Sequence, residues 1–201
     1  MLQLPIPRGP GKAKLWLTAD EHYGHANIIG YQDRPFANVQ AMDKALIANH
    51  NSVVGPEDSV FHVGDICLGS RMDLILILRR LNGTHYLMDG SHDRALMQYE
   101  REPANDLQGK VVVIPKLFEF KYGGHKITLC HYAMAKFWCS HHGSLHAFGH
   151  SHGHYDHPGR AIDVGVDVHG YFPLLIDDFI RQALKKPVIG NHPRDDEEEE
   201  A

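Results

Sequence analysis

Short apolar runs in the first half of the chain predict three buried strands. They cover residues 12–20, 58–65 and 86–90, and each ends on an aspartate or a glycine. Runs of this length that are rich in β-branched, aromatic and leucine residues are typical of strands. Because apolar positions between these runs recur at a longer period, we expect the strands to alternate with helices.

Three helices are predicted from apolar positions three and four residues apart. The first begins after Asn38, a good N-cap, and its apolar face consists of Val39, Met42, Leu46 and Ile47. The second begins at Ser70 or Asp73 and ends at the Asn-Gly pair at 82–83. A third, short helix is expected over about 93–101.

Strand patterns dominate the second half of the chain. Residues 111–131 predict three strands, and the last two are joined as a hairpin through Gly123-Gly124. Two further strands are expected at 145–150 and 160–165. A final helix is predicted over 173–184, with Pro173 in its first turn.

Early alternation of strands and helices, followed by a strand-rich half, predicts an α/β (α+β) fold. We expect a two-sheet β-sandwich core flanked by helices. Residues 14–186 are predicted to form a single domain, because a chain of 201 residues can bury a full hydrophobic core. Residues 1–13 are expected to form an irregular arm, and residues 187–201 an acidic, disordered tail.

Charge and composition narrow the range of partners. The formal net charge is −5, but residues 191–201 contain one arginine and six acidic residues, so the rest of the chain is formally neutral. Because residues 1–190 are formally neutral, they lack the basic character of proteins that bind duplex DNA. No apolar run reaches the roughly 20 residues that span a bilayer, and no signal peptide is visible. Cys67, Cys130 and Cys139 lack metal-type spacing, so free thiols and a cytoplasmic location are expected.

Side chains that bind metals or carry protons follow five of the predicted strands. Histidine is abundant, with 17 residues, seven of them between His141 and His157. The strand ends in question are the segments 17–25, 62–65, 88–93, 128–131 and 148–152. Because ligands of open α/β sheets bind beyond the carboxyl ends of the strands, we expect these segments to meet at one site. His62, inside its strand, is interpreted as a core histidine.

The ligand chemistry of these segments is coherent. Asp20 and His22 are two residues apart, as are His150 and His152, so each pair faces one side of an extended segment. The two oxygens of Asp65 can bridge two ions. Oxygen and imidazole ligands without thiolate suit Mn, Fe, Zn, Co or Ni. Two such ions about 3.5–4 Å apart can clamp a phosphate and generate hydroxide at neutral pH.

The order of these motifs resembles that of the calcineurin-like metallophosphoesterase superfamily. The matching segments are Asp20-Glu21-His22, Gly64-Asp65, Gly90-Ser91-His92-Asp93, His131 and Gly149-His150-Ser151-His152. The early segments D-E-H-Y-G-H-A-N-I-I, R-P-F and N-S-V-V-G-P-E-D resemble its small stand-alone bacterial and phage members. The resemblance spans residues 20–152 and implies a four-layer architecture, with a metal-bearing β-sandwich between helices.

The resemblance also implies a set of roles. The first ion would be held by Asp20, His22, Asp65 and His152, with Asp65 bridging to a second ion held by His131, His150 and Ser91. His92 would act as general acid, positioned by Asp93, while a hydroxide that bridges the ions attacks phosphorus in line. Manganese is the expected metal. His25, Arg34 and Arg94 are candidates for contacts to the phosphate.

The consecutive residues Ser91, His92 and Asp93 do not indicate a serine hydrolase. Side chains of consecutive residues diverge, so the three cannot form a nucleophile–base–orienter chain. The nucleophile-elbow pattern G-x-S-x-G is also absent here. Ser91 instead stands where the resembling family has asparagine, and a hydroxyl is a poorer metal ligand than an amide oxygen. We therefore expect weaker binding at the second site and reduced turnover, with the first site intact.

The favoured hypothesis is a dinuclear phosphoesterase that hydrolyses phosphodiesters or phosphomonoesters, with nucleotides among the candidate substrates. A second hypothesis is a nuclease for single strands or ends, which a basic, aromatic-lined channel leading to His92 would favour. A third is a catalytically impaired metal-binding protein, for which Ser91 is the best argument. No membrane partner is expected, and the sequence leaves the oligomeric state open.

Overall fold

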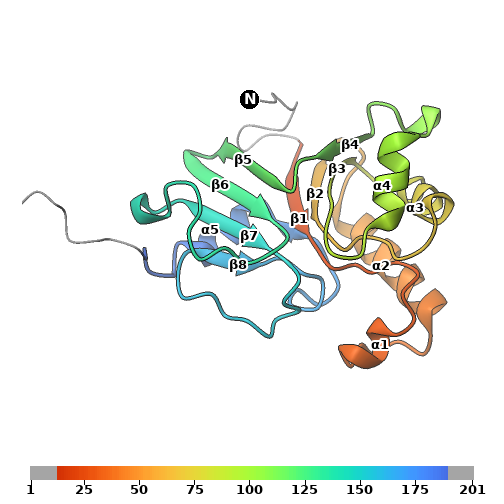
Figure 1. The fold of residues 1–201 in the computed structure, drawn as a ribbon, viewed down its shortest axis with the longest axis horizontal. Helices are drawn as coiled ribbons and strands as arrows, with labels where there is room; N and C mark the ends of the chain where they lie inside the picture. The colour runs from red at the N-terminus through yellow and green to blue at the C-terminus, as the bar shows by residue number, and fades with distance from the viewer. Residues whose placement is uncertain (1–12, 190–201) are drawn as a thin grey trace, which may run out of the picture.

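A computed structural model describes residues 13–189, whose strands form two facing sheets (Figure 1). The first sheet has the order β4 (Val111–Ile114), β3 (Thr84–Met88), β2 (Ser59–Val63), β1 (Leu15–Thr18) and β9 (Leu174–Leu175). Its strands β1 to β4 are parallel, and β9 is antiparallel to β1. The second sheet has the order β5 (Leu117–Tyr122), β6 (His125–Cys130), β7 (Leu145–Phe148) and β8 (Ala161–Asp163). Only β5 is antiparallel to its neighbour there.

The period-two pattern of the strands divides their side chains between two cores. Inward-facing residues such as Leu17, Phe61 and Tyr86 of the first sheet pack with Phe120 and Leu129 of the second. The opposite face of the first sheet packs against α2 (Val39–Val53), α3 (Arg71–Leu78) and α4 (Arg94–Arg101) (Figure 1). The first sheet is thus covered on both faces, by the second sheet and by helices, which is why β1, β2 and β3 are buried at almost every position.

Further segments complete the two ends of the sandwich. Helix α5 (Ile176–Ala183) contacts β1 and β9 of the first sheet and β7 and β8 of the second. The short helix α1 (Ile28–Tyr31) follows the loop after β1. Two single-turn 3₁₀ helices, η1 (Asn105–Leu107) and η2 (Ser140–His142), lie in connecting loops. The predicted α/β fold with a two-sheet sandwich and flanking helices is therefore confirmed.

Local signals placed most elements correctly. The Asn38 side chain accepts a hydrogen bond from the backbone N–H of Ala41 and caps α2. Ser70 and Asp73 form a capping box, so the two candidate starts of α3 are the two halves of one cap. The predicted hairpin between β5 and β6 is also confirmed.

The prediction of a helix from Pro173 is wrong at its start. Leu174 and Leu175 form strand β9 and pair with Leu17 and Trp16, and α5 begins only at Ile176. The edge of β1 offers unpaired backbone groups, and pairing with them outweighs the helical preference of leucine. Residues 1–12 and 190–201, which hold most of the predicted arm and tail, lie outside the described residues. Across 13–189, no helix is long and apolar enough to cross a membrane.

The topology brings the carboxyl ends of strands from both sheets together. The loops after β1 and β8 pair through an isolated parallel bridge between Ala19 and Gly165. The backbone N–H of Asp20 donates to the Gly64 carbonyl after β2 (3.1 Å), and that of Gly149 donates to the His131 carbonyl (3.0 Å). The segments predicted to carry ligands are therefore joined by backbone hydrogen bonds.

Candidate metal centre

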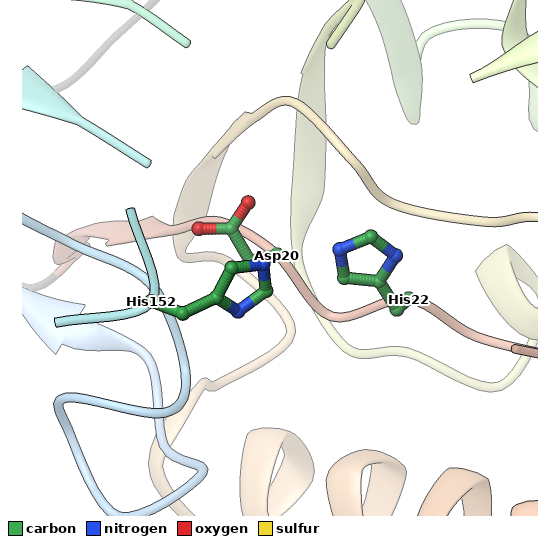
Figure 2. Close-up of side chains that lie close together, drawn as sticks. All are labelled: Asp20, His22 and His152. Carbon is green, nitrogen blue, oxygen red and sulfur yellow. The ribbon is translucent and has the colours of Figure 1, made fainter. Parts of the chain in front are cut away.

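Six of the seven predicted ligands form two groups at this edge of the sandwich. Asp20, His22 and His152 make up the first group, and Asp65, His131 and His150 the second. Within each group the ligand atoms lie within 4.8 Å of one another. Figure 2 shows the first group, with Asp20 and His22 on the segment after β1 and His152 approaching from a segment of the second half of the chain.

Asp65 links the two groups through one oxygen atom. Its Oδ2 lies 3.6 Å from His22 Nε2 in the first group and 3.4 Å from His131 Nε2 in the second. The Asp65 side chain is almost fully buried. A carboxylate between two imidazoles that belong to different groups offers its oxygen atoms to both groups.

Unpaired imidazole nitrogens show that these residues suit a cation. Nε2 of His22 and Nε2 of His131 are buried, and neither has a hydrogen-bond partner among the described residues. The opposite nitrogens are engaged, because His131 Nδ1 lies 2.9 Å from the Val63 carbonyl and His22 Nδ1 lies 3.2 Å from His25 Nδ1. A buried nitrogen without a partner is costly, and a bound divalent ion would remove that cost.

The backbone of the candidate ligands is strained. Asp20, His22, Asp65, His150 and His152 all have positive φ, between 47° and 66°. Residues other than glycine rarely adopt this left-handed region, and such strain of roughly 1–3 kcal/mol per residue concentrates at functional sites. The strain persists because surrounding contacts hold the ligand segments in place.

Two glycines make room for the ligands. A Cβ atom at Gly64 would lie 2.4 Å from His131 Nδ1, and one at Gly90 would lie 2.4 Å from Asp65 Oδ1. Both distances are far below van der Waals contact. The glycines of the G-D and G-S-H-D motifs are therefore required by close packing around the two buried ligands.

Ser91 and His92 hold Asp65 through their backbone. Their N–H groups donate to Asp65 Oδ1 at 2.6 and 2.8 Å, and the Ser91 hydroxyl donates to Asp65 Oδ2 at 2.8 Å. The sequence predicted Ser91 as a direct metal ligand. In the structure, Ser91 instead donates hydrogen bonds to the Asp65 carboxylate. Both side chains are exposed, and the His92 ring lies 5.7 Å from that of His22.

The structure corrects the predicted role of Asp93. Its carboxylate accepts hydrogen bonds from the backbone N–H groups of Asp65 (2.7 Å), Ile66 (2.7 Å) and Gly90 (2.9 Å), and in the described chain it makes no hydrogen bond to the His92 ring. Burial raises the pKa of Asp93 to about 6 despite these bonds. Asp93 therefore joins the loops after β2 and β3 and does not position His92.

Arg34 is also corrected. It is buried and uses its five donors on protein atoms. Two donors form a bidentate pair with Asp167 at 2.8 and 2.7 Å, and others reach the carbonyls of Asp20 and Glu21 at 2.7 and 3.0 Å. No donor is left for a phosphate, so Arg34 supports the ligand segment from behind.

Asp167 is a site residue that the sequence prediction missed. Its Oδ2 lies 2.7 Å from His152 Nδ1, which leaves His152 Nε2 free to bind an ion. A carboxylate behind a ligating histidine fixes the ring orientation and tautomer. The available signal was a further carboxylate after a predicted strand, in the run A-I-D-V-G-V-D that continues β8.

A buried chain of side chains lies on the helix-facing side of the first sheet. Glu21 Oε1 lies 2.6 Å from His62 Nδ1, and His62 Nε2 lies 3.0 Å from His85 Nδ1. All three side chains are buried, so the interpretation of His62 as a core histidine holds. These contacts connect Glu21, which lies between Asp20 and His22, to His62 of β2 and His85 of β3.

The other two residues predicted to contact substrate, His25 and Arg94, are accessible to solvent and lie near His92. His25 is partly exposed, and its ring lies 6.3 Å from that of His92. Arg94 is exposed and is the first residue of α4, two residues after His92. Both positions leave contact with a bound phosphate as a prediction.

Burial controls the protonation of the first group. Desolvation raises the pKa of Asp20 to about 7 and lowers the pKa of His22 to about 3. Burial alone would also lower the pKa of His152, but the Asp167 carboxylate raises it above its usual value. Burial opposes ionisation of Asp65, yet His131 and Ser91 hold its pKa well below the usual range. The metal-free site therefore retains protons that a cation would displace.

Comparisons with known proteins give relatives without a described activity. No protein-family model matches the chain. The "Uncharacterized protein MJ1445" of Methanocaldococcus jannaschii is 31% identical over 185 residues, covering 88% of this chain and 94% of that protein. The crystal structure of the protein of unknown function AQ665 from Aquifex aeolicus matches with a TM-score of 0.63 and 22% identity, covering 85% of this chain and 100% of that one. The latter similarity supports the fold.

Proposed function

This chain belongs to the family of the M. jannaschii protein MJ1445, and because that relative is uncharacterized, we propose a function from the site itself. The proposed activity is hydrolysis of phosphate esters, preferentially diesters, with two divalent transition-metal ions, most favourably manganese. The motif resemblance to calcineurin-like metallophosphoesterases supports the same assignment. Three free cysteines support a reducing, cytoplasmic setting.

The observation that carries the proposal is the position of Asp65 between two unpaired imidazoles. Nε2 of His22 and Nε2 of His131 both face Asp65 Oδ2, at 3.6 and 3.4 Å, and both are buried without another partner among the described residues. A purely structural cluster would satisfy these nitrogens with hydrogen bonds. Two separate groups that share one carboxylate match the donor set of a dinuclear centre.

Divalent ions bound by these groups would neutralise phosphate charge and lower the pKa of the attacking water. The chain's own residues then have three tasks. Asp20, Asp65 and four histidines would hold the ions, and neutral His22 keeps its lone pair available at physiological pH because burial lowers its pKa to about 3. Exposed His92 has its ring 5.7 Å from that of His22, and from there it would protonate the leaving-group oxygen. Partly exposed His25 lies beside His92 and can donate to a phosphate oxygen.

Hydrolysis of bis(4-nitrophenyl) phosphate by metal-stripped protein, titrated with Mn²⁺, tests the proposal. We expect turnover to require Mn²⁺ and to fall at least 100-fold in Asp65→Asn. His141→Ala, at an exposed histidine of η2 outside both groups, serves as the matched control and should retain full activity. Binding of Mn²⁺ without hydrolysis, in both the natural chain and its Ser91→Asn form, would contradict the assigned reaction.

A second candidate function rests on Ser91. Its hydroxyl donates to Asp65 Oδ2 at 2.8 Å, the atom expected to bridge the ions. A metal-binding protein with impaired catalysis would follow if this hydrogen bond weakens the second site. Mn²⁺ binding with hydrolysis only after Ser91→Asn would favour this candidate over an efficient enzyme.

A further inference from the structure

An open hollow of about 740 Å³ lies beside α1, and the proposed reaction does not account for it. Its lining begins at Ala26, the residue after His25, and includes Tyr31 and the start of α2 at Val39. Hollows of this size can receive a nucleoside-sized group. The lining thus starts one residue after His25, which lies beside the candidate ligand His22.

Aromatic rings connect the hollow with the candidate metal centre. Tyr31 is 69% exposed, and its ring meets that of His25 edge to face at 6.2 Å. The His25 ring in turn lies 5.2 Å from that of His22. An ester whose phosphate lies at the ions can therefore extend past His25 toward Tyr31.

The lining of the hollow suits a flat, neutral group. Ala26, Gly30 and Ala37 contribute only small side chains to the lining, and among the described residues a Cβ atom at Gly30 would meet nothing within 4 Å. The Asn27 side chain makes no capping hydrogen bond, so its amide can pair with polar edges of a ring. Within residues 13–189, no charged side chain lines the hollow. A strand with repeated phosphates would require cations there, whereas a single base requires only stacking and hydrogen bonds.

We propose that this hollow binds the base of a nucleoside phosphodiester by stacking on Tyr31. The inference rests on the proposed function, because it places the ester's phosphate at the ions. It narrows the substrate class to small nucleotide esters and disfavours the alternative of a single-strand nuclease.

Two esters with the same leaving group test the proposal. Thymidine 5′-(4-nitrophenyl phosphate) and methyl 4-nitrophenyl phosphate differ only in the group that the hollow would bind. We expect Mn²⁺-loaded protein to prefer the thymidine ester, and Tyr31→Ala to lower the ratio of the two kcat/KM values about tenfold, while Tyr31→Phe keeps it. Tyr155→Ala, at another exposed tyrosine, should leave the ratio unchanged. An equal ratio in the natural chain and Tyr31→Ala would overturn the proposal.

A binding measurement separates this inference from the proposed reaction. Thymidine 5′-monophosphate should bind the Mn²⁺-loaded protein about tenfold more tightly than it binds Tyr31→Ala. If binding depends on Tyr31 but the protein hydrolyses neither ester, the result would support base binding in the hollow and refute the phosphoesterase assignment. If both esters are hydrolysed and thymidine monophosphate binds the natural chain and Tyr31→Ala equally, the proposed base binding is refuted, while the phosphoesterase assignment stands.

Discussion

Glu21 Oε1 lies 2.6 Å from His62 Nδ1, and both side chains are buried on the face of the sheet that the helices cover. The residues on either side of Glu21, Asp20 and His22, have φ values of 59° and 55° and contribute ligands to the first group. A side chain anchored between two strained ligands holds their backbone in the binding conformation.

Loss of this anchor should weaken metal binding. We expect Glu21→Ala to reduce Mn²⁺ affinity about 10–100-fold, the range typical for groups that support metal ligands. Glu21→Gln keeps an oxygen that accepts from His62 and should retain most of the affinity. Isothermal titration of metal-stripped protein measures both variants, with circular dichroism to verify the fold. Equal affinity in Glu21→Ala and the natural chain would contradict the anchoring role.

Because Asp167 contacts His152, removing the Asp167 carboxylate should weaken binding of the first ion only. Asp167→Ala removes the carboxylate that orients His152 and leaves two donors of Arg34 unpaired. We expect first-site affinity to fall about 10–100-fold, so that the protein retains one ion after gel filtration. Asp156→Ala, at an exposed aspartate paired with Lys186, is the control. Elemental analysis that finds equal metal content in both variants would argue against the assignment.

The raised pKa of Asp20 predicts a pH-dependent stability of the metal-free protein. Burial raises this pKa from 3.8 to about 7, so between these values the folded state keeps a proton that the unfolded state loses. The free energy of unfolding should therefore fall as pH rises from about 4 to 7, by a few kcal/mol from this group. Asp20→Asn should remove that contribution.

Urea unfolding in the presence of a chelator, from pH 5 to pH 8, measures this effect. The difference in stability between Asp20→Asn and the natural chain should grow in favour of the variant as pH rises, and level off above about pH 7. The difference between the two proteins isolates Asp20 from Asp93, whose raised pKa acts in the same direction. Parallel stability curves would show that Asp20 does not carry the effect.

Replacing Ser91 with asparagine should increase both metal binding at the second site and the rate of hydrolysis. Ser91→Asn supplies an amide oxygen for the second ion, whereas the serine hydroxyl donates to the shared oxygen of Asp65. We expect second-site affinity for Mn²⁺ and the rate of diester hydrolysis each to rise about tenfold. Ser52→Asn, at an exposed serine of α2 outside both ligand groups, should leave both quantities unchanged. Stepwise titration resolves the two binding events, and an unchanged second step would remove Ser91 as the explanation for reduced turnover.

Much of the fold and the candidate ligands could be predicted because their signals are local. Apolar runs define the strands, capping residues such as Asn38 and Ser70 begin the helices, and the ligand candidates come directly after the strands. Parallel strands place their carboxyl ends at one edge, so strand order along the chain was enough to expect one site. The two-sheet sandwich followed from the same pattern.

The supporting contacts could not be predicted, because they join distant parts of the chain. Arg34 and Asp167 are 133 residues apart and meet only when the loops after β1 and β8 pair. The sequence predicted that Arg34 contacts phosphate and that Asp93 positions His92. In the structure, both side chains form hydrogen bonds with buried backbone groups. Likewise, β9 formed where a helix was expected, because β1 had a free edge.

The sequence by itself therefore determined which residues can bind metal, since ligand chemistry and strand position are properties of short segments. The tertiary structure alone decided how they are held. Left-handed backbone at five ligands and the buried contacts of Glu21, Asp93 and Asp167 depend on packing between two sheets. Such strain and burial are stable only when the whole sandwich supplies compensating contacts, which no local pattern encodes.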